Sequence, residues 1–336
     1  MQIVRTDANL TLPVVDAALR MQGHTLVLLP DGVSESALVE AVRDAELILM
    51  CYTPITRRVI ENAPKLKGIV KYGVGIDAID IPAAIARGIP VVNIPEYAEN
   101  TVAEGAFALL LALTRKLKPL MRTMTREGWA WPTPEWLATD LSGKTVAIIG
   151  AGRIGRHFAR MAQGFSMRVV AYDPHVSERT LAALGVEKVA HLADALSVAD
   201  VVSIHCVLND ETRHLIGERE IASMKSSAVL INVSRGAIVD EAALTRALLN
   251  KRIAGAALDV MSVEPFDMAN HPMRELAALD HVILSPHLTF YSYEAMTRLE
   301  AETLERCAEI IEGRAVLVKS HDPRLRAQSS GVRFAD

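Results

Sequence analysis

A glycine-rich turn near the middle of the chain constrains its fold more than any other feature. The segment Val146-Ala-Ile-Ile-Gly150-Ala-Gly152-Arg-Ile-Gly155 leads from a short apolar run into a helical pattern over residues 153–164. Glycines at this spacing allow a tight turn, a close approach of the backbone to a ligand, and close packing of a helix on a strand. Because N–H groups at a helix N-terminus bind anions, the turn suits a pyrophosphate. The pattern predicts a dinucleotide-binding βαβ unit rather than an ordinary glycine turn.

An acidic residue follows where such a unit needs one. The apolar run 168–172 is followed directly by Asp173. A carboxylate there accepts hydrogen bonds from both ribose hydroxyls. It also repels a ribose 2′-phosphate, although His175 and Arg179 soften that repulsion. We therefore expect NAD as the cofactor, with NADH preferred over NADPH.

The length and composition of the chain indicate two domains of α/β type. The chain has 336 residues, of which 50% are hydrophobic and 4% aromatic, so each domain can bury a core. The formal net charge of −4 offers no basic field for nucleic acid. The apolar helical stretch 103–113 contains Glu104 and is too short to span a bilayer. The first residues lack the apolar core of a signal peptide, so we expect a cytoplasmic protein without a nucleic-acid or membrane partner.

The cysteines give no sign of a disulfide framework or a metal site. Cys51, Cys206 and Cys307 are scattered singly, without a CxxC pair or a nearby histidine at ligand spacing. We expect no metal, and we interpret the three cysteines as small buried hydrophobic residues.

Strand and helix patterns alternate along the whole chain. Apolar, β-branched runs predict one set of strands at 2–5, 25–29, 46–51, 68–72 and 90–94. After an apolar helix from about Thr101, a second set is predicted at 145–149, 168–172, 201–205, 228–232, 255–258 and 282–285. A last helix, 292–311, follows the second sheet, and we expect it to pack on the first domain.

The predicted architecture is an α/β fold of two domains, with a Rossmann doubly wound cofactor domain inserted into a flavodoxin-like substrate domain. The cofactor domain is expected at 100–289. The substrate domain is expected to be discontinuous, at 1–99 plus 290–320, with a polar C-terminal tail at 321–336.

Side chains with useful chemistry follow successive strands of the second domain. They are Arg235 after the run 229–233, Asp259 after 256–258, Glu264 in the loop beyond, and His287 after 282–285. Ligands of doubly wound sheets bind at the carboxyl ends of the strands. An arginine holds a carboxylate through two bonds, and a histidine transfers a proton near neutral pH. Each residue alone is commonly structural, but together beside a nicotinamide they predict hydride transfer to a small 2-oxo acid.

A second glycine turn, Gly73-Val74-Gly75, follows the predicted strand 68–72. We expect the N–H groups of Val74 and Gly75 to hold the substrate carboxylate together with Arg235, although a plain strand-to-helix turn is the alternative. Lys71 and Arg57 either meet a second anionic group such as phosphate or, as is commoner, are solvated surface charges. Aromatic residues nearby favour a substituent bulkier or less charged than phosphate. The candidate substrate-binding residues are Tyr52, Lys71, Gly73, Val74, Gly75, Arg235, Phe290 and Tyr291.

These motifs resemble those of the D-isomer-specific 2-hydroxyacid dehydrogenases over nearly the whole chain. The motifs are GAGRIG at 150–155, NVSRG at 232–236, DVxxxEP at 259–265 and SPH at 285–287. The resemblance implies a catalytic set of Arg235, Glu264 and His287, with His287 as the proton donor. It also implies a substrate domain that closes over the cofactor domain, and a homodimer formed through the cofactor domains. The implied cofactor contacts are Thr101, Gly150, Gly152, Arg153, Ile154, Gly155, Asp173, Cys206, Thr212, Val233 and Asp259.

Some features leave the subfamily open. Val207 stands where relatives often carry proline, so the loop 205–212 is expected to be less rigid. The aromatics after His287 resemble D-lactate dehydrogenases, whereas the other motifs resemble the glycerate and phosphoglycerate branch. A tryptophan of the segment 129–136 either reaches a neighbouring subunit's site or packs in a core or an interface. Two other functions stay open: a corepressor-like dinucleotide sensor, and an enzyme acting on an unusual reductant such as phosphite.

Overall fold

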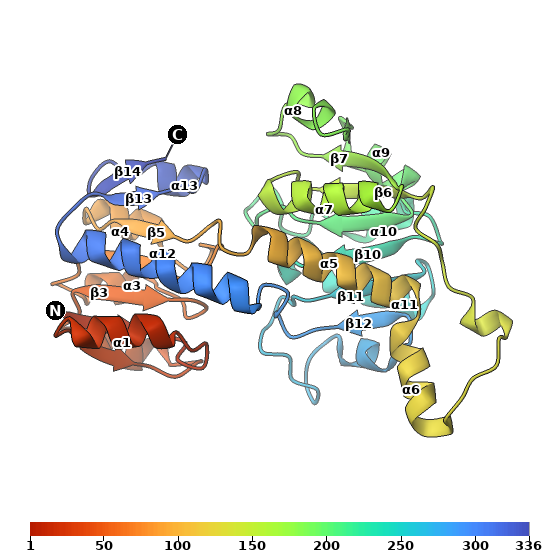
Figure 1. The fold of residues 1–336 in the computed structure, drawn as a ribbon. Coiled ribbons are helices and arrows are strands. Elements are labelled where there is room, and N and C mark those ends of the chain that lie inside the picture. Colours follow the sequence, from red (N-terminus) through yellow and green to blue (C-terminus); the bar gives the residue numbers. More distant parts are fainter. Residues whose placement is uncertain (336) are drawn as a thin grey trace. The chain divides into compact units, whose positions relative to one another are not determined.

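The computed structural model describes residues 1–335, which form two compact units (Figure 1). Unit 1 contains Met1–Ala98 and the chain from Tyr291 onward, and unit 2 contains Glu99–Phe290. The chain therefore passes between the units twice, next to the boundaries expected from the sequence. Within residues 1–335, no helix is both long and apolar enough to cross a bilayer.

Unit 1 is built on a five-stranded parallel sheet with the order β2-β1-β3-β4-β5, which is the flavodoxin-like order. The strands are short apolar runs, and the helices between them begin at capping residues such as Ser34, Thr56 and Asp80. The elements are β1 (Gln2–Arg5), α1 (Pro13–Met21), β2 (Thr25–Leu28), α2 (Glu35–Ala41), β3 (Leu47–Met50), α3 (Arg57–Glu61), β4 (Gly68–Lys71), α4 (Ile81–Ala86) and β5 (Val91–Asn93).

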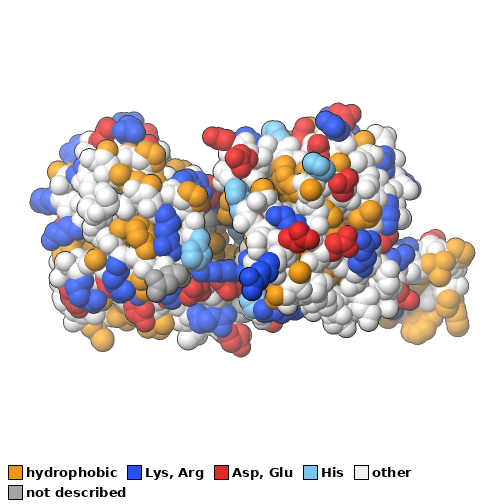
Figure 2. Space-filling model, turned by 90° about the horizontal axis from the view of Figure 1, so that it is seen from above, with side chains coloured by type: hydrophobic (Ala, Val, Ile, Leu, Met, Phe, Trp, Pro, Cys, Tyr) orange, Lys and Arg blue, Asp and Glu red, His pale blue; other side chains and the backbone are white. Residues whose placement is uncertain are grey.

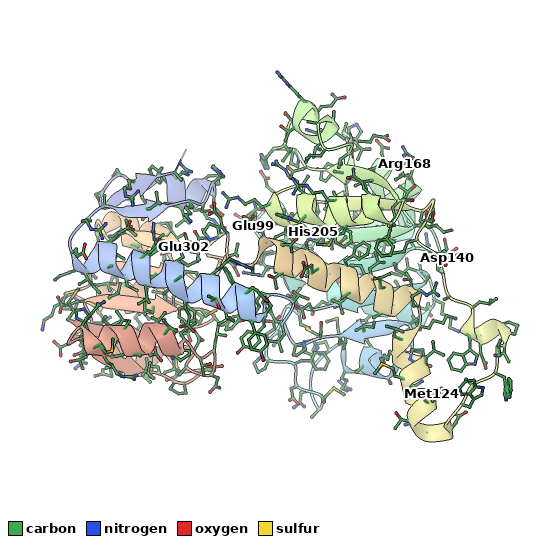
Figure 3. The ribbon with its side chains drawn as sticks, in the orientation of Figure 1. Glu99, Met124, Asp140, Arg168, His205 and Glu302 are labelled. Atoms are coloured by element: carbon green, nitrogen blue, oxygen red, sulfur yellow. The ribbon has the colours of Figure 1, made fainter. Side chains whose placement is uncertain are left out.

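The C-terminal part of the chain completes unit 1. Helix α12 (Tyr293–Ile311) packs over β4, where a Cβ on Gly68 would lie only 2.6 Å from Ile310 Cδ1. Glu302 lies on this helix, within unit 1 (Figure 3). The remaining elements are β13 (Val316–Val318), α13 (Pro323–Arg326) and β14 (Val332–Phe334).

The expectation of a separate polar tail at 321–336 was wrong for the described residues. Strands β13 and β14 form a two-stranded parallel sheet. The side chain of Gln328 accepts the N–H of Val91 at 2.7 Å and donates to the Val91 carbonyl at 2.9 Å. The buried amide of Gln328 thus pairs with the backbone of β5 as a neighbouring strand would. The polar composition of residues 321–336 does not reveal this role.

Unit 2 contains a seven-stranded parallel sheet with the order β12-β11-β10-β9-β6-β7-β8. The strand order reverses around β6, and such switch points bind dinucleotides. The two-residue strand β8 was not among the six strands predicted, because it has no apolar run. The strands are β6 (Thr145–Ile149), β7 (Arg168–Tyr172), β8 (Glu187–Lys188), β9 (Val201–Ile204), β10 (Val229–Asn232), β11 (Gly255–Leu258) and β12 (Val282–Leu284).

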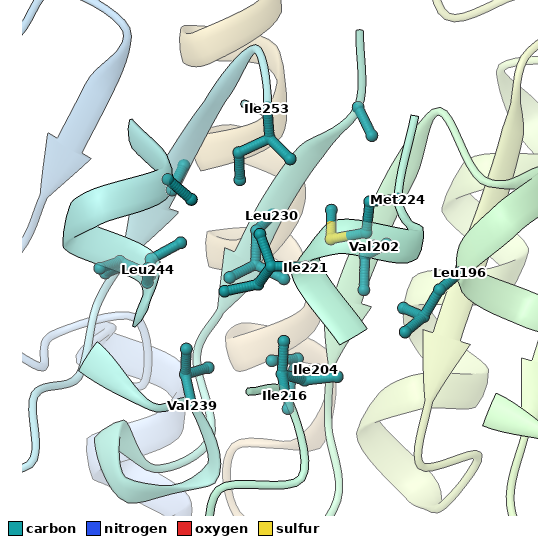
Figure 4. Close-up of a cluster of buried hydrophobic side chains, with 14 of the residues drawn as sticks. Leu196, Val202, Ile204, Ile216, Ile221, Met224, Leu230, Val239, Leu244 and Ile253 are labelled. Atoms are coloured by element: carbon teal, nitrogen blue, oxygen red, sulfur yellow. The ribbon is translucent and has the colours of Figure 1, made fainter. Parts of the chain in front are cut away.

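Helices cover both faces of this sheet, as the doubly wound pattern predicts. Helices α5 and α7 lie together on one face (Figure 1). Aliphatic side chains of α9, α10 and α11 form a buried cluster with the strands (Figure 4). The helices are α5 (Glu99–Thr114), α6 (Leu117–Glu127), α7 (Arg153–Gly164), α8 (Glu178–Ala182), α9 (Leu192–Val198), α10 (Glu218–Ser223) and α11 (Glu241–Leu249), with 3-10 turns η1 (Pro134–Trp136), η2 (Gly236–Ile238) and η3 (Arg274–Ala278).

Candidate active site

The glycine turn between β6 and α7 has the geometry of a phosphate-binding loop. Gly150 has φ +94°, and a Cβ there would lie 2.4 Å from the backbone nitrogen of Cys206. A Cβ on Gly155 would lie 2.3 Å from the carbonyl oxygen of Gly150, so α7 begins close against the strand. By contrast, a Cβ on Gly152 would meet nothing within 4 Å. The two flanking glycines thus shape the turn, and the middle one leaves space at the helix N-terminus, where N–H groups bind anions.

Asp173 lies at the end of β7 and holds this loop. Its Oδ2 accepts the N–H of Ala151 at 2.8 Å, and its Oδ1 accepts the N–H groups of His175 at 2.8 Å and Val176 at 3.2 Å. A carboxylate has about four lone-pair positions, so acceptor capacity remains for a ribose hydroxyl. The cradle and its acid therefore fit the adenosine half of NAD.

The loop after β9 is closed by its own hydrogen bonds. The hydroxyl of Thr212 donates to the carbonyl of Val207 at 2.6 Å and accepts the N–H of Asn209 at 2.9 Å. The Asn209 side chain in turn accepts the N–H of Thr212 at 3.0 Å. These bonds connect the two ends of the loop, and its expected lower rigidity stays a prediction.

Two polar residues beside the glycine loop remain uncharged. Burial raises the pKa of the Cys206 thiol to about 12, and burial lowers the pKa of His205 to about 3. His205, labelled in Figure 3, shares a hydrogen bond of 2.8 Å with the Ser203 hydroxyl. Neither side chain is suited to supply a proton or a thiolate near neutral pH.

Arg235 is positioned by a buried amide that the sequence reasoning did not single out. Asn232, at the end of β10, donates through Nδ2 to the carbonyl of Arg235 at 2.9 Å. Its Oδ1 accepts the N–H of Ser234 at 3.0 Å. The Arg235 guanidinium donates through Nη1 to the carbonyl of Ser234 at 2.8 Å. The asparagine of the NVSRG motif was the available signal, because a buried polar residue at a strand end needs partners.

Asp259 shapes the loop that carries His287. Its carboxylate is fully buried and accepts the hydroxyl of Ser285, the N–H of Leu288, and both the N–H and the hydroxyl of Thr289. The backbone N–H of His287 donates to the Asp259 carbonyl at 2.8 Å, and His287 adopts φ +56°. Asp259 thus holds a left-handed turn at His287, and its predicted contact with the cofactor stays a prediction.

Glu264 and His287 form a hydrogen-bonded pair. Glu264 Oε2 lies 2.8 Å from His287 Nδ1, and Glu264 Oε1 accepts the N–H of Met261 at 2.9 Å. Burial raises the pKa of Glu264, but the hydrogen bond and charge of His287, the Met261 N–H and the Arg235 charge outweigh it, so the pKa lies below its ordinary value. The carboxylate stays ionised and orients the ring through Nδ1. The ring of Phe290 stands at 87° to the imidazole, with centroids 6.3 Å apart.

Tyr52, Lys71 and the turn 73–75, all predicted to bind substrate, lie around the end of β4. The N–H groups of Val74 and Gly75 donate to no backbone carbonyl within residues 1–335. Lys71 is only 5% exposed, so the expectation of a solvated surface charge was wrong. Its Nζ donates to the carbonyl of Cys51, lies 3.2 Å from Cys51 Sγ, and is 5.4 Å from the centre of the Tyr52 ring.

Other predicted residues lie as follows. Arg57 is a surface charge, with Asp80 at 3.7 Å and Glu61 at 3.9 Å. Thr101 lies in the first turns of α5, and Arg153 Nε lies 3.3 Å from Glu99 Oε1. Ile154 lies in α7, and Val233 is buried directly after β10. Tyr291 is half exposed in unit 1, and its role as a pocket wall stays a prediction.

Within residues 1–335, the cysteines form no disulfide and no cluster of metal ligands is present. Cys51 and Cys307 are buried and Cys206 is half-buried, and no disulfide joins them within the described chain. Across residues 1–335, no three His, Cys, Asp or Glu side chains gather as metal ligands would.

Comparisons with known proteins agree with this geometry. Residues 107–289 match the family described as "D-isomer specific 2-hydroxyacid dehydrogenase, NAD binding domain". The chain is 41% identical over 269 residues to a glyoxylate reductase of Korarchaeum cryptofilum, covering 79% of this chain and 80% of that protein. It is 36% identical over 283 residues to a D-3-phosphoglycerate dehydrogenase of Methanocaldococcus jannaschii, covering 84% of this chain but only 53% of that longer protein. A crystal structure of D-lactate dehydrogenase from Aquifex aeolicus, complexed with NAD and lactic acid, superposes with a TM-score of 0.83 at 29% identity, covering 93% of this chain and 96% of that one.

Proposed function

The chain belongs to the D-isomer specific 2-hydroxyacid dehydrogenases, and from this premise we propose that it reduces a small 2-oxo acid with NADH, using His287 as the proton donor. It is an NAD-dependent oxidoreductase that interconverts 2-oxo and 2-hydroxy acids. The observation that carries the assignment of roles is the 2.8 Å contact between Glu264 and His287. It fixes the orientation of the imidazole ring through Nδ1, and we assign proton transfer to Nε2.

The cofactor is NAD, and the glycine loop fits it. When bound in reduced form, NAD supplies the hydride that the 2-oxo carbon accepts. The N–H groups at the start of α7 and the turn around Gly152 would hold the pyrophosphate. Asp173 would accept a ribose hydroxyl and disfavour a 2′-phosphate through like-charge repulsion. These residues support a preference for NADH over NADPH.

His287 and Arg235 would then complete the reaction on the substrate. As the hydride reaches the carbonyl carbon, His287 Nε2 gives its proton to the carbonyl oxygen, which becomes the hydroxyl. Glu264 stabilises the imidazolium before the transfer and accepts the Nδ1–H afterwards. The planar guanidinium of Arg235 is suited to hold the substrate carboxylate and to polarise the adjacent carbonyl. In the reverse direction, neutral His287 removes the proton from the hydroxyl.

Lys71, a residue of unit 1, is further support for an acidic substrate. Its buried ammonium has no carboxylate within salt-bridge distance among the described residues, and a buried charge without a counter-charge is unstable. Its Nζ lies 3.0 Å from the position that a Cβ on Gly73 would take, directly beside the turn whose N–H groups lack acceptors. We assign Lys71, Val74 and Gly75 to an anion-binding turn.

A panel of substrates tests this function. Wild-type protein would be given NADH or NADPH with glyoxylate, hydroxypyruvate, pyruvate, phenylpyruvate and phosphohydroxypyruvate, and the chirality of each product determined. We expect NADH-dependent turnover of at least one acid to a D-2-hydroxy acid. Tight NADH binding without turnover of any acid would favour the dinucleotide sensor. NAD reduction by phosphite instead would favour the unusual reductant.

Unit 2 also has a surface suited to a second copy of the chain. Apolar side chains of α6 and the following segment are exposed: Leu117, Met121, Met124, Trp129, Trp131 and Leu137. Hydrophobic side chains gather at this end of unit 2 in Figure 2, and Met124 is labelled on α6 in Figure 3. Trp131 is 76% exposed, which excludes the core role considered for that tryptophan. Exposed apolar patches of this kind mark protein interfaces, and we assign this one to a homodimer.

Light scattering coupled to size exclusion tests the dimer. We expect a dimer for the wild type and a monomer for Trp131→Ser combined with Met124→Ser. Met21→Ser removes a comparably exposed apolar side chain from unit 1 and should leave the dimer intact. A monomeric wild type would refute the assignment.

A further inference from the structure

A residue of helix α11, which follows Arg235 in the chain, is hydrogen-bonded to the loop that carries Glu264. Glu241, in the first turn of α11, accepts the backbone N–H of Ser262 at 2.6 Å through Oε1. Its Oε2 accepts the hydroxyl of the same serine. We infer that Glu241 is a positioning residue that keeps the Glu264 carboxylate on His287. This inference rests on the proposed function of the Glu264–His287 pair.

A short path of hydrogen bonds connects Glu241 with His287. Ser262 directly follows Met261, whose N–H donates to Glu264 Oε1 at 2.9 Å. The other oxygen of Glu264 faces His287 Nδ1 at 2.8 Å. Residues 261–264 therefore form a tight loop, with the Glu241 carboxylate bonded at one end and the imidazole bonded at the other.

Close packing fixes the same loop against the residue after Arg235. A Cβ on Gly236 would lie 2.0 Å from the carbonyl carbon of Met261 and 2.2 Å from the nitrogen of Ser262. Only glycine fits at such distances, so the backbones of the two loops are in direct contact. Five residues separate Arg235 from Glu241, so the segment 236–241 that follows Arg235 contacts the Glu264 loop at two points, Gly236 and Glu241.

Substitutions at Glu241 distinguish positioning from ordinary helix stabilisation. An acidic residue in a first turn also stabilises a helix through its dipole, and that effect alone would not reach His287. Glutamine retains one acceptor oxygen for the Ser262 N–H and an NH₂ donor for its hydroxyl. Alanine retains neither and leaves a charge-assisted bond unmade. A positioning role therefore predicts that glutamine rescues function and alanine does not.

Kinetics provide the first test. For Glu241→Ala, we expect kcat for 2-oxo acid reduction to fall about tenfold, with KM and the Kd for NADH changed by less than about twofold. The pH at which reduction is half-maximal should move down, in the same direction as for Glu264→Gln. Glu241→Gln should resemble the wild type. The matched control is Arg246→Gln, on the same helix, which removes an exposed pair with Glu218 at 3.0 Å and should leave these values unchanged.

A double variant shows whether Glu241 acts through Glu264. In a Glu264→Gln background, Glu241→Ala should cause little further loss of kcat and no further movement of the pH midpoint, because contacting residues in one network are not additive. The same fold loss in both backgrounds, or an unmoved midpoint in the single variant, would overturn the inference and leave a structural role.

Proton NMR gives a readout that does not need turnover. A histidine N–H bonded to a carboxylate resonates far downfield, and the His287 signal can be assigned by its loss in His287→Asn. We expect the signal in the wild type, Glu241→Gln and Arg246→Gln, and its loss in Glu241→Ala. A signal that persists in Glu241→Ala overturns the inference even if the enzyme is active. If the wild type turns over no 2-oxo acid, the proposed function fails, while loss of the signal in Glu241→Ala still supports the positioning role.

Discussion

Glu264 Oε2 lies 2.8 Å from Nδ1 of His287, although 22 residues separate the two in sequence. The bond commits Nδ1 to the carboxylate, and the proposed mechanism assigns proton transfer to Nε2. The low pKa of Glu264 keeps that carboxylate charged across the range in which histidines titrate.

Replacing Glu264 should therefore change the pH dependence of the reaction. In the proposed mechanism, reduction requires protonated His287, and the neutral amide of Glu264→Gln stabilises an imidazolium less than a carboxylate does. We expect kcat/KM for reduction to begin to fall at a lower pH in Glu264→Gln than in the wild type. Above neutrality, kcat/KM of the variant should be about tenfold or more below the wild-type value. Oxidation of the 2-hydroxy acid needs neutral His287, so kcat/KM for oxidation should rise with pH over the range in which kcat/KM for reduction falls. Profiles with the same midpoint in both proteins would contradict the assigned role of Glu264.

We expect the cofactor preference to depend on Asp173. Asp173→Ala removes both the repulsion of a 2′-phosphate and the bond to the Ala151 N–H. We expect KM for NADH to rise and the preference for NADH over NADPH to fall at least about tenfold, equivalent to about 1.4 kcal/mol. Initial rates with each cofactor measure this. Glu178→Gln, a change of a nearby acid in α8, serves as the control and should keep the wild-type preference.

Lys71 should affect the substrate rather than the cofactor. Lys71→Met removes the buried ammonium beside Gly73, and we expect KM for the 2-oxo acid to rise about tenfold, as for loss of a charge-assisted contact. The Kd for NADH, measured by fluorescence, should not change. Arg57→Gln removes a surface arginine of the same unit and should have no effect on either constant. An unchanged KM in Lys71→Met would restrict the lysine to a structural role.

Asp7 should control the stability of unit 1. Its buried carboxylate accepts the hydroxyls of Thr6 and Thr53 and the N–H groups of Cys51, Tyr52 and Thr53. Burial raises its pKa, but these hydrogen bonds outweigh burial and lower it. Because the folded pKa lies below the unfolded value, the stabilisation is present above the ordinary carboxyl range and is lost as pH falls through the folded pKa.

Asp7→Asn places an amide NH₂ among these donors, and we expect it to lower the free energy of unfolding by about 2–4 kcal/mol near neutral pH. The difference from the wild type should shrink on acidification. Thermal unfolding at a series of pH values, followed by circular dichroism, measures both effects. Asp31→Asn is the exposed control, with a single bond to the Asn9 N–H, and equal stability of the two variants would argue against the Asp7 network.

Sequence reasoning predicted the fold class, the family and the cofactor because their signals are local. Gly150 and Gly155 have steric reasons that their spacing expresses, and the positions of the residues after strands follow from the doubly wound rule. These signals predicted the fold class, the family and NAD, which the comparisons confirm. The assignment of individual site residues stays a prediction.

Features formed by distant partners were not predictable in this way. Lys71 is buried by Cys51 and the Gly73 turn, and Glu241 reaches Ser262 across 21 positions. Gln328 replaces a strand beside Val91, 237 positions away. In each case the sequence alone would place a polar side chain at the surface. Only folding brings up the distant partner whose hydrogen bonds allow that side chain to be buried or held in place.

The rate of NADH oxidation by His287→Asn, in the presence of the 2-oxo acid that the wild type prefers, tests the proposed function most directly. We expect the rate to fall about 10²–10⁴-fold, the usual contribution of a general acid, while the Kd for NADH stays within about twofold of the wild type. A variant that reduces the acid at the wild-type rate would contradict the central role of His287.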